Sequence, residues 1–259
     1  MGTSFPKSVR VMFDEFGPHL PYAANLAELL RVPVAVFAPL PDVALHSGGT
    51  LLGLADYQLR AEMHGRIGTH TRAHLTQGQT TEVHTHIEES RFGDEYIFVS
   101  CDTDAYLHIP VLSPAGETKV FRGAKGSIFV PLGDGPSGIV GAKYGVQLAK
   151  RLDTDVVFWH TTWQNTAVAE SDPRAHVTSS AGDVIATAEA LARESSVTHT
   201  TQCVCADDVV QGIIGAAQRA GASLVVMARG GHKISGTYTD RVRARNCPIP
   251  MLTLPKEVA

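Results

Sequence analysis

The same order of predicted elements occurs twice along this chain, and this repeat limits the possible folds more than any single motif does. Each copy has the pattern of a buried strand, an amphipathic helix and a second buried strand: residues 9–14, 22–30 and 34–37 in the first half, and 128–132, 140–152 and 156–159 in the second. From Leu26 and Leu148 to Phe37 and Trp159, the copies are aligned at a constant offset of 122 residues. Strand, helix and strand within roughly 30 residues predict a βαβ unit with parallel strands and a right-handed crossover.

Both halves continue with a long helix, two more strands and a final strand that contains proline. We expect the helix at 54–75 and 181–194, and the strands at 81–87, 96–99 and 109–112 and at 200–205, 224–227 and 249–252. At an offset of 119, this alignment places His84 and His86 level with Cys203 and Cys205. The predicted fold class is therefore α/β, with two tandem open, mainly parallel sheets flanked by helices and related by a pseudo-twofold axis. The predicted domains are 1–112 and 127–259, joined by a linker at 113–126.

The two copies are not equally complete. Between its last three strands, the second half has a predicted helix at 208–220 and another at 239–244, whereas the first half has only residues 90–95 and 100–107 there. A crossover between parallel strands needs a dozen or more residues. We therefore predict that the first half is an eroded copy. Its last strand, at 109–112, should pair antiparallel, lie at a sheet edge or pair with another chain.

Composition and charge exclude several classes of function. The net charge is −4 and the pI is about 6.3, and no run of lysine and arginine supplies the basic surface that nucleic-acid binding needs. No apolar run is long enough to span a bilayer, and residues 1–7 lack the apolar core of a signal peptide. Four cysteines among 259 residues are not typical of a disulfide framework. We therefore expect a cytoplasmic protein with reduced thiols.

Residues 126–160 contain a strand, a turn with an aspartate, a helix that ends in Leu-Ala-Lys-Arg-Leu and a buried strand that ends in histidine. In this order of elements the second half resembles the universal stress protein family. Residues 224–231 resemble the fourth strand and glycine loop of that family, 236–242 its last helix and 246–252 its closing strand. The resemblance implies five parallel strands with helices on both faces, and a nucleotide site at the carboxyl ends of the strands. It reaches the first half only through the internal repeat, and tandem members of the family exist.

The resemblance also implies candidate site residues. The candidates for nucleotide or phosphate binding are Gly133, Asp134, Ala228, Gly231, Gly236 and Thr237, with Asp14 as the equivalent in the first domain. Three features differ from the family pattern: Gly133 occupies the place of the acid, Ala228 that of the first loop glycine, and only residues 232–235 separate the later glycines. A shorter loop offers fewer backbone N–H groups to a phosphate. We therefore expect ATP or AMP binding to be weak or lost, and we predict no other cofactor.

Residues 133–138, GDGPSG, also match the G-x-G-x-x-G pattern of dinucleotide-binding proteins, and they lie between a strand and a helix. Pro136 stiffens this turn, however. The end of the second strand, at His160 and Thr161, offers no acid to bind a ribose. Glycines in a turn of this kind also occur for backbone reasons alone.

A metal site is a second alternative, because eight of the twelve histidines lie in the first half. His70 and His74 share a helix face, and His84 and His86 share one face of a strand. Zinc needs three or four ligands that converge on one point, and nothing in the sequence brings this helix and strand face to face. We therefore predict no metal ligands. No order of serine, histidine and acidic residues predicts a catalytic set either.

These observations predict a protein that acts by binding and favour a protein that is not an enzyme. The resemblance implies that it acts in stress response or regulation. The expected partner is a small nucleotide or phosphate ligand, another protein or a second copy of this chain. We expect no binding to nucleic acid or to membranes. One alternative is a nucleotide- or dinucleotide-dependent enzyme on the same sheet. The other is an interaction module whose first half has become a partner surface.

Overall fold

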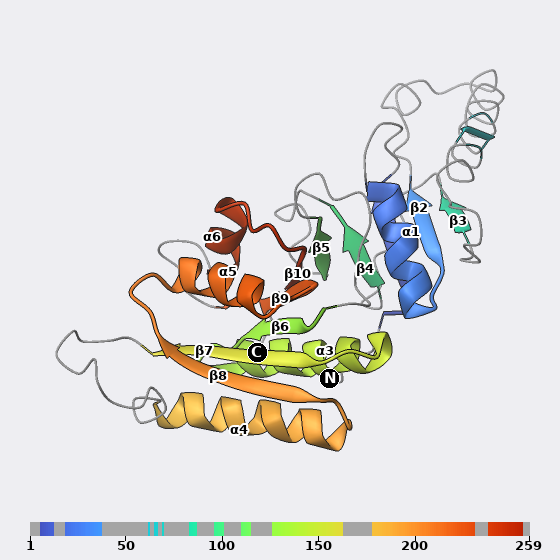
Figure 1. The fold of residues 1–259 in the computed structure, drawn as a ribbon. Helices are drawn as coiled ribbons and strands as arrows, with labels where there is room; N and C mark the ends of the chain where they lie inside the picture. The colour runs from blue at the N-terminus through green and yellow to red at the C-terminus, as the bar shows by residue number, and fades with distance from the viewer. Residues whose placement is uncertain are drawn as a thin grey trace, which may run out of the picture. The chain divides into compact units, whose positions relative to one another are not determined.

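The computed structural model describes residues 6–12, 19–37, 62, 65–66, 69, 83–86, 96–100, 110–114, 126–162, 178–230 and 238–255. The described elements form two compact units, and each is built on a β-sheet (Figure 1). The first unit contains β1 to β4 and α1, and the second contains β5 to β10 and α3 to α6. The α/β fold class predicted from the sequence is confirmed.

The first unit is a four-stranded parallel sheet with one well-described helix. Its elements are β1 (Ser8–Met12), α1 (His19–Leu30), β2 (Val34–Phe37), β3 (Val83–His86) and β4 (Tyr96–Val99), and the strand order is β3-β2-β1-β4. Helix α1 buries Tyr22, Leu26 and Leu30, at the spacing of one helix face. Within the helix expected at 54–75, the four described residues (62, 65, 66 and 69) are helical and exposed.

The second unit has a longer sheet with helices on both faces. Its elements are β5 (Val111–Ser113), β6 (Ile128–Pro131), α3 (Pro136–Leu152), β7 (Val156–Thr162), α4 (Ser179–Glu194), β8 (His199–Cys205), α5 (Val209–Arg219), β9 (Leu224–Ala228), α6 (Tyr238–Ala244) and β10 (Met251–Leu254). The strand order is β5-β10-β9-β6-β7-β8. Helices α5 and α6 lie on one face, and α4, which packs against α3, lies on the other (Figure 1).

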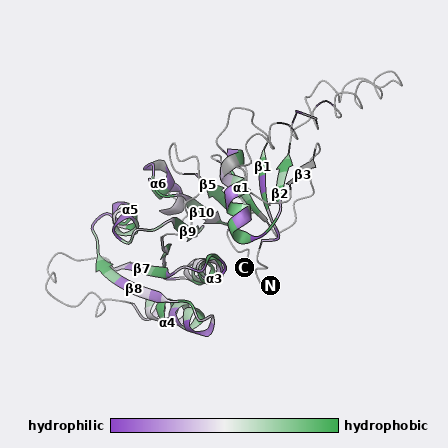
Figure 2. Cartoon of the chain, turned by 45° about the vertical axis from the view of Figure 1, so that its right-hand side comes forward, coloured by the Kyte–Doolittle hydropathy of each residue, from purple (hydrophilic) through white to green (hydrophobic). Residues whose placement is uncertain are grey.

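The core of the second unit lies between α5, α6 and the sheet. Alternate residues of the strands pack there, including Phe129, Val157, Trp159 and Met227. Residues 199–202 of β8 are hydrophilic, whereas β9 is hydrophobic (Figure 2). No residue of β8 is fully buried, which fits its position at the end of the strand order. On the opposite face, the Thr201 hydroxyl donates to a Glu189 carboxylate oxygen at 2.7 Å and joins β8 to α4.

Strand β5 pairs antiparallel with β10, which is one of the three arrangements expected from the short connection before it. All other described strand pairs of this unit are parallel. Leu112 lies opposite Leu252 in the register, and these two leucines occupy equivalent positions in the sequence repeat. The β5–β10 pair therefore has local twofold symmetry centred on two equivalent residues. Strand β5 belongs to the same compact unit as the second half. The predicted domain limits themselves remain a prediction.

The repeat extends to details of the backbone at the end of the first helix of each unit. Arg31 and Asp153, 122 residues apart, both adopt the left-handed conformation, with φ of 56° and 51°. The residue after each of them donates its N–H to the helix, from Val32 to Ala27 at 2.9 Å and from Thr154 to Ala149 at 3.0 Å. These bonds satisfy carbonyl groups that a helix end leaves open. The two βαβ units are therefore copies of one local structure.

A second correspondence concerns Tyr22 and Tyr144, which also lie 122 residues apart. Both are buried, and burial raises the pKa of both phenols. Because removing a phenolate from water is unfavourable, both side chains stay neutral. Equivalent positions of α1 and α3 thus face equivalent interiors.

The structure corrects the sequence alignment of the third strands. Val34 pairs with Val83 in the first unit, and its equivalent Val156 pairs with His199 in the second. The offset of this strand is therefore 116 residues and not 119, and His84 lies level with Thr200 instead of Cys203. A variable connection precedes this strand in each half, so the sequence alone did not define its register.

Several predicted boundaries also shift. Strands β5 and β10 begin two residues later than expected, after Pro110 and Pro250, because proline has no N–H to donate. Helix α3 begins at Pro136, four residues before the predicted start. Among the described helices, none is long and apolar enough to cross a bilayer.

Candidate functional site

A cavity of about 600 Å³ opens in the second unit at the carboxyl ends of β6, β7 and β9. It is lined by residues 131–138, 159–161, 227, 228 and 230, by Val209 and Ile213 of α5, and by Tyr238 and Thr239 of α6. Ligands of open parallel sheets bind at this end, where the helices that follow the strands begin. Every part of this cavity belongs to the second unit.

The turn between β6 and α3 forms one wall of the cavity and contains three glycines. Gly138 is required by the fold: a Cβ there would lie 2.5 Å from the Gly133 carbonyl oxygen. Gly133 and Gly135 are different. A Cβ added at Gly133 would meet only the Ser137 hydroxyl, at 4.0 Å, and a Cβ added at Gly135 would meet no described atom within 4 Å. Neither has a positive φ. Their effect is to leave bare backbone along the cavity wall.

Helix α3 begins at this turn without a side-chain cap. Its N-cap is Gly135, and no described side chain accepts a hydrogen bond from the first turn. In contrast, the Thr178 hydroxyl caps α4 by accepting from the Ala181 N–H at 3.2 Å, and the Asp208 carboxylate caps α5. The first turn of α3 also has no acidic residue. The positive end of a 17-residue helix therefore lies beside the cavity.

His160 lies at the end of β7 and is 96% buried, with a relative exposure of 4%. Its Nδ1 lies 2.9 Å from the Leu132 carbonyl oxygen. Because a carbonyl only accepts, Nδ1 carries the proton and donates. Its Nε2 lies 3.8 Å from Oδ1 of Asp134, beyond hydrogen-bond distance, and the Asp134 side chain is 56% exposed. The neutral ring thus presents an acceptor at Nε2, and the protonated ring presents a donor.

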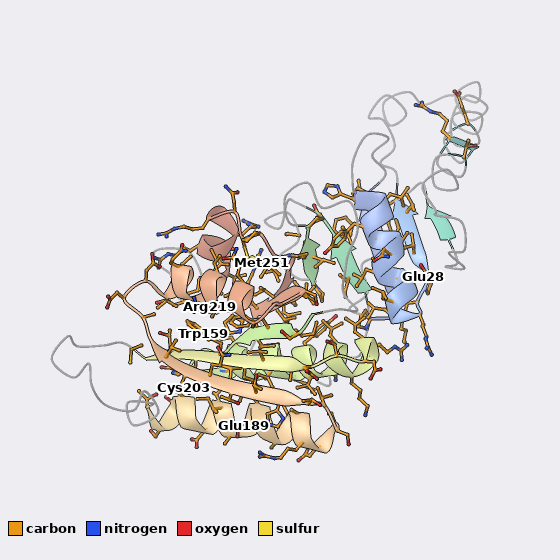
Figure 3. The ribbon with its side chains drawn as sticks, viewed as in Figure 1. Glu28, Trp159, Glu189, Cys203, Arg219 and Met251 are labelled. Atoms are coloured by element: carbon orange, nitrogen blue, oxygen red, sulfur yellow. The ribbon has the colours of Figure 1, made fainter. Side chains whose placement is uncertain are left out.

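Trp159 forms the apolar floor of the cavity with Val209, Ile213 and Met227. It lies on the core face of β7 (Figure 3), and its ring centroid is 6.3 Å from that of Phe129. Gly212 of α5 makes room for the indole, since a Cβ there would come within 3.2 Å of it. No described atom accepts a hydrogen bond from the indole Nε1. This wall is suited to a flat apolar group.

Polar contacts hold α6 at the mouth of the cavity. The Thr239 hydroxyl donates to the Ala228 carbonyl at 3.3 Å, and the Arg241 guanidinium lies 5.5 Å from the centroid of the Tyr238 ring. Next to α6, Arg245 binds the Asp208 carboxylate at 3.1 Å. The Gln211 backbone N–H lowers the pKa of Asp208 most strongly, and Arg245 lowers it further. Asp208 therefore stays ionised as the cap of α5.

The cavity brings together three of the candidate residues from the sequence: Gly133, Asp134 and Ala228. Gly231, Gly236, Thr237 and Asp14 lie outside the described residues. Their role in binding remains a prediction for all seven. Sequence reasoning missed His160 and Ser137 as cavity residues. A histidine that ends a predicted parallel strand, level with a glycine-rich turn, was the available signal for the first of these.

For a metal centre, the described residues contain no group of three or more histidine, cysteine, aspartate or glutamate side chains that could hold an ion. His70 and His74 lie outside the described residues, and of His84 and His86 only the backbone is described.

Comparisons of sequence give no relative: no model of a protein family matches the chain, and no curated protein matches it. Comparisons of structure do. A universal stress protein from Archaeoglobus fulgidus DSM 4304 is 10% identical, with a TM-score of 0.64 over 97% of this chain and 100% of its own. A putative universal stress protein from Pseudomonas aeruginosa UCBPP-PA14 is 11% identical, with a TM-score of 0.52 over 96% and 93%.

A protein of unknown function from Pseudomonas aeruginosa PAO1 gives a TM-score of 0.55 at 11% identity, over 97% of this chain and 93% of its own. All three matches extend over nearly the whole chain, so they include both halves. The chain has the tandem fold of the two universal stress proteins. At such low identity the likeness shows the fold and not the activity.

Proposed function

We propose that this chain is a universal-stress-protein-like protein that acts by binding a small phosphate-bearing molecule in the cavity of its second half, as part of stress response or regulation. Among the described residues, those that line this cavity all belong to the second unit.

One observation carries the proposal: bare glycine backbone and an uncapped helix N-terminus lie on the wall of a cavity of about 600 Å³. A cavity of this size accommodates a small molecule. Backbone N–H groups at a helix N-terminus favour an anionic group. The apolar wall at Trp159, Ile213 and Met227 is suited to the uncharged part of the same molecule.

We expect Mg-ATP itself to bind weakly or not at all. Ala228 stands where the loop after β9 would need bare backbone, and only four residues separate Gly231 from Gly236. Each charge-assisted hydrogen bond to a phosphate contributes about 1.5–3 kcal/mol, so the loss of two or three would weaken binding by about two orders of magnitude or more. Calorimetry with Mg-ATP measures this directly. A micromolar dissociation constant that is lost in Gly236→Val would show that the short loop still binds the triphosphate.

The proposed function is tested by mass spectrometry of the protein as purified and by thermal denaturation with a panel of phosphate-bearing molecules. Retained or stabilising mononucleotides or sugar phosphates support it. A retained dinucleotide would instead favour an enzyme on the same sheet. If no phosphate-bearing molecule is retained or raises the melting temperature, the proposal is wrong and the interaction module becomes the better hypothesis.

A further inference from the structure

We infer that the anionic group of the ligand, a phosphate monoester, is held at the β6–α3 turn and that its binding adds a proton to His160. This inference rests on the proposed function and assigns the anion to a different loop from the one that the sequence resemblance implied. It concerns Gly133, Gly135, Ser137 and His160, of which only Gly133 was a candidate from the sequence.

The first step concerns the space at the turn. An added Cβ at Gly135 would meet no described atom within 4 Å, and one at Gly133 would meet only Ser137 Oγ at 4.0 Å. Gly138 draws the turn tightly against the start of α3. Pro136 has no N–H, and the Gly138 N–H donates to the Gly135 carbonyl at 2.9 Å, so among these first residues it is the Ser137 N–H that is left for a ligand beside the bare backbone. Ser137 adds a hydroxyl on the same wall. A tetrahedral oxyanion is the kind of group that such a surface binds.

The second step concerns His160, which points to a ligand independently of the helix. Its Nδ1 is held by the Leu132 carbonyl at 2.9 Å, so only Nε2 is left to contact the cavity. No described group lies within hydrogen-bond distance of Nε2. A neutral ring with its proton on Nδ1 offers a lone pair at Nε2, which repels an oxyanion. A protonated ring offers a charge-assisted N–H donor instead.

The third step concerns Asp134, the acidic residue of the same turn. Its carboxylate would repel a phosphate at Gly133, and its Oδ1 lies 3.8 Å from Nε2 of His160. An imidazolium between the two anions attracts both, so anion binding and protonation of His160 favour each other. From β8, the residue level with His160 in the register is Cys203. The charged group in described contact with the ring is the Asp134 carboxylate.

Calorimetry of ribose 5-phosphate at one pH, in two buffers of different ionisation enthalpy, measures the protons taken up on binding. We expect about one proton per ligand and none with uncharged ribose as the matched probe. The variant His160→Asn keeps an amide donor for the Leu132 carbonyl but removes Nε2. We expect it to abolish the proton uptake and to weaken binding by about tenfold or more.

The matched pair Gly133→Val and Gly182→Val tests the turn. Both glycines have open space for a side chain, but only Gly133 lines the cavity. We expect Gly133→Val to abolish binding of ribose 5-phosphate and Gly182→Val to leave it unchanged. If His160→Asn or Gly133→Val unfolds, the ¹⁵N chemical shifts of the histidine rings in the wild-type protein, with and without ribose 5-phosphate, report the protonation directly.

Each outcome decides between the two proposals. Binding of ribose 5-phosphate with no proton uptake, or binding that survives Gly133→Val, overturns the assignment to the turn and leaves the proposed function standing. Binding that survives Gly133→Val but is lost in Gly236→Val places the anion at the loop after β9. If neither ribose 5-phosphate nor any other phosphate-bearing molecule binds the wild-type protein, the proposed function is wrong and this inference falls with it.

Discussion

Helices α1 and α3 end alike but pack differently against their strands. At their ends, Arg31 and Asp153 adopt the same left-handed conformation and are followed by the same hydrogen bond. Along the helix, α3 has Gly145 where α1 has the buried Ala23, and a Cβ at Gly145 would lie 2.5 Å from a Val130 methyl. The shared end closes the chain reversal that every βαβ unit needs. Helix α3 therefore lies closer to its strand β6 than a helix with alanine at this position could. The start of this same helix lines the cavity.

The largest difference between the units is expected at Trp159 and Phe37, which are equivalent in the repeat. Trp159 is the larger and the more fully buried. We expect Trp159→Ala to lower the free energy of unfolding of the second unit by about 3–5 kcal/mol. We expect Phe37→Ala to lower that of the first unit by less, near the lower end of the same range. Hydrogen exchange should show faster opening of β7 and β9 for Trp159→Ala. Equal acceleration of β1 and β2 would mean that the units do not open separately.

The pairing of β5 with β10 gives the second test. Leu112 and Leu252 are each 1% exposed and lie opposite one another. Replacing either by alanine should cost about 2–5 kcal/mol, and the double variant should cost less than the sum, because neighbouring residues do not act independently. Denaturant unfolding of the three variants measures this. An additive double variant would contradict the direct pairing.

The closer approach of α3 gives a smaller effect. Gly145→Ala should destabilise the second unit by about 1–3 kcal/mol, because the new methyl overlaps Val130. Gly182→Ala in α4 is the matched control, since its Cβ would meet no described atom within 4 Å. This control should stabilise the protein by about 0.4–1 kcal/mol. If Gly145→Ala raised the melting temperature as the control does, the close contact of α3 with β6 would be disproved.

The smallest expected effect is a pH dependence at Asp208. Its pKa is lowered from 3.8 in the folded protein. The carboxylate therefore adds stability above the unfolded pKa, and this contribution is lost as the pH falls through the folded value. In Asp208→Asn, the stability of the second unit should fall less steeply below about pH 4 than in the wild-type protein. Identical acid denaturation curves for the two proteins would refute this role.

Most of the fold could be predicted because apolar periodicity records which faces are buried. The repeat and the strands follow from patterns and connection lengths, which for β5 left antiparallel pairing as one of three possible arrangements. The register of β3 could not be predicted, because a register depends on contacts across the sheet. The start of α3 was placed too late because its first turn, Pro136 to Gly138, contains almost no apolar residue to show a helical period.

The candidate site could be predicted only in part. The glycines at 133–138 were recognised, but the sequence could not show that Gly138 is required by its neighbours while Gly133 and Gly135 are not. That distinction depends on the space around each backbone atom. His160 was missed as a cavity residue for a similar reason: only the structure shows that one ring nitrogen is held by Leu132 and that the other is left for the cavity.

The most direct test of the central claim is a titration of the full chain with ribose 5-phosphate, followed through the backbone amide signals. If the second half alone holds the anion at its β6–α3 turn, the amides of Ser137 and Gly138 should shift together with the ring signals of His160. The amides of His19 and Leu20, at the start of α1, should stay in place. Equal shifts at the starts of both helices, or shifts confined to the segment after β9, would contradict the account.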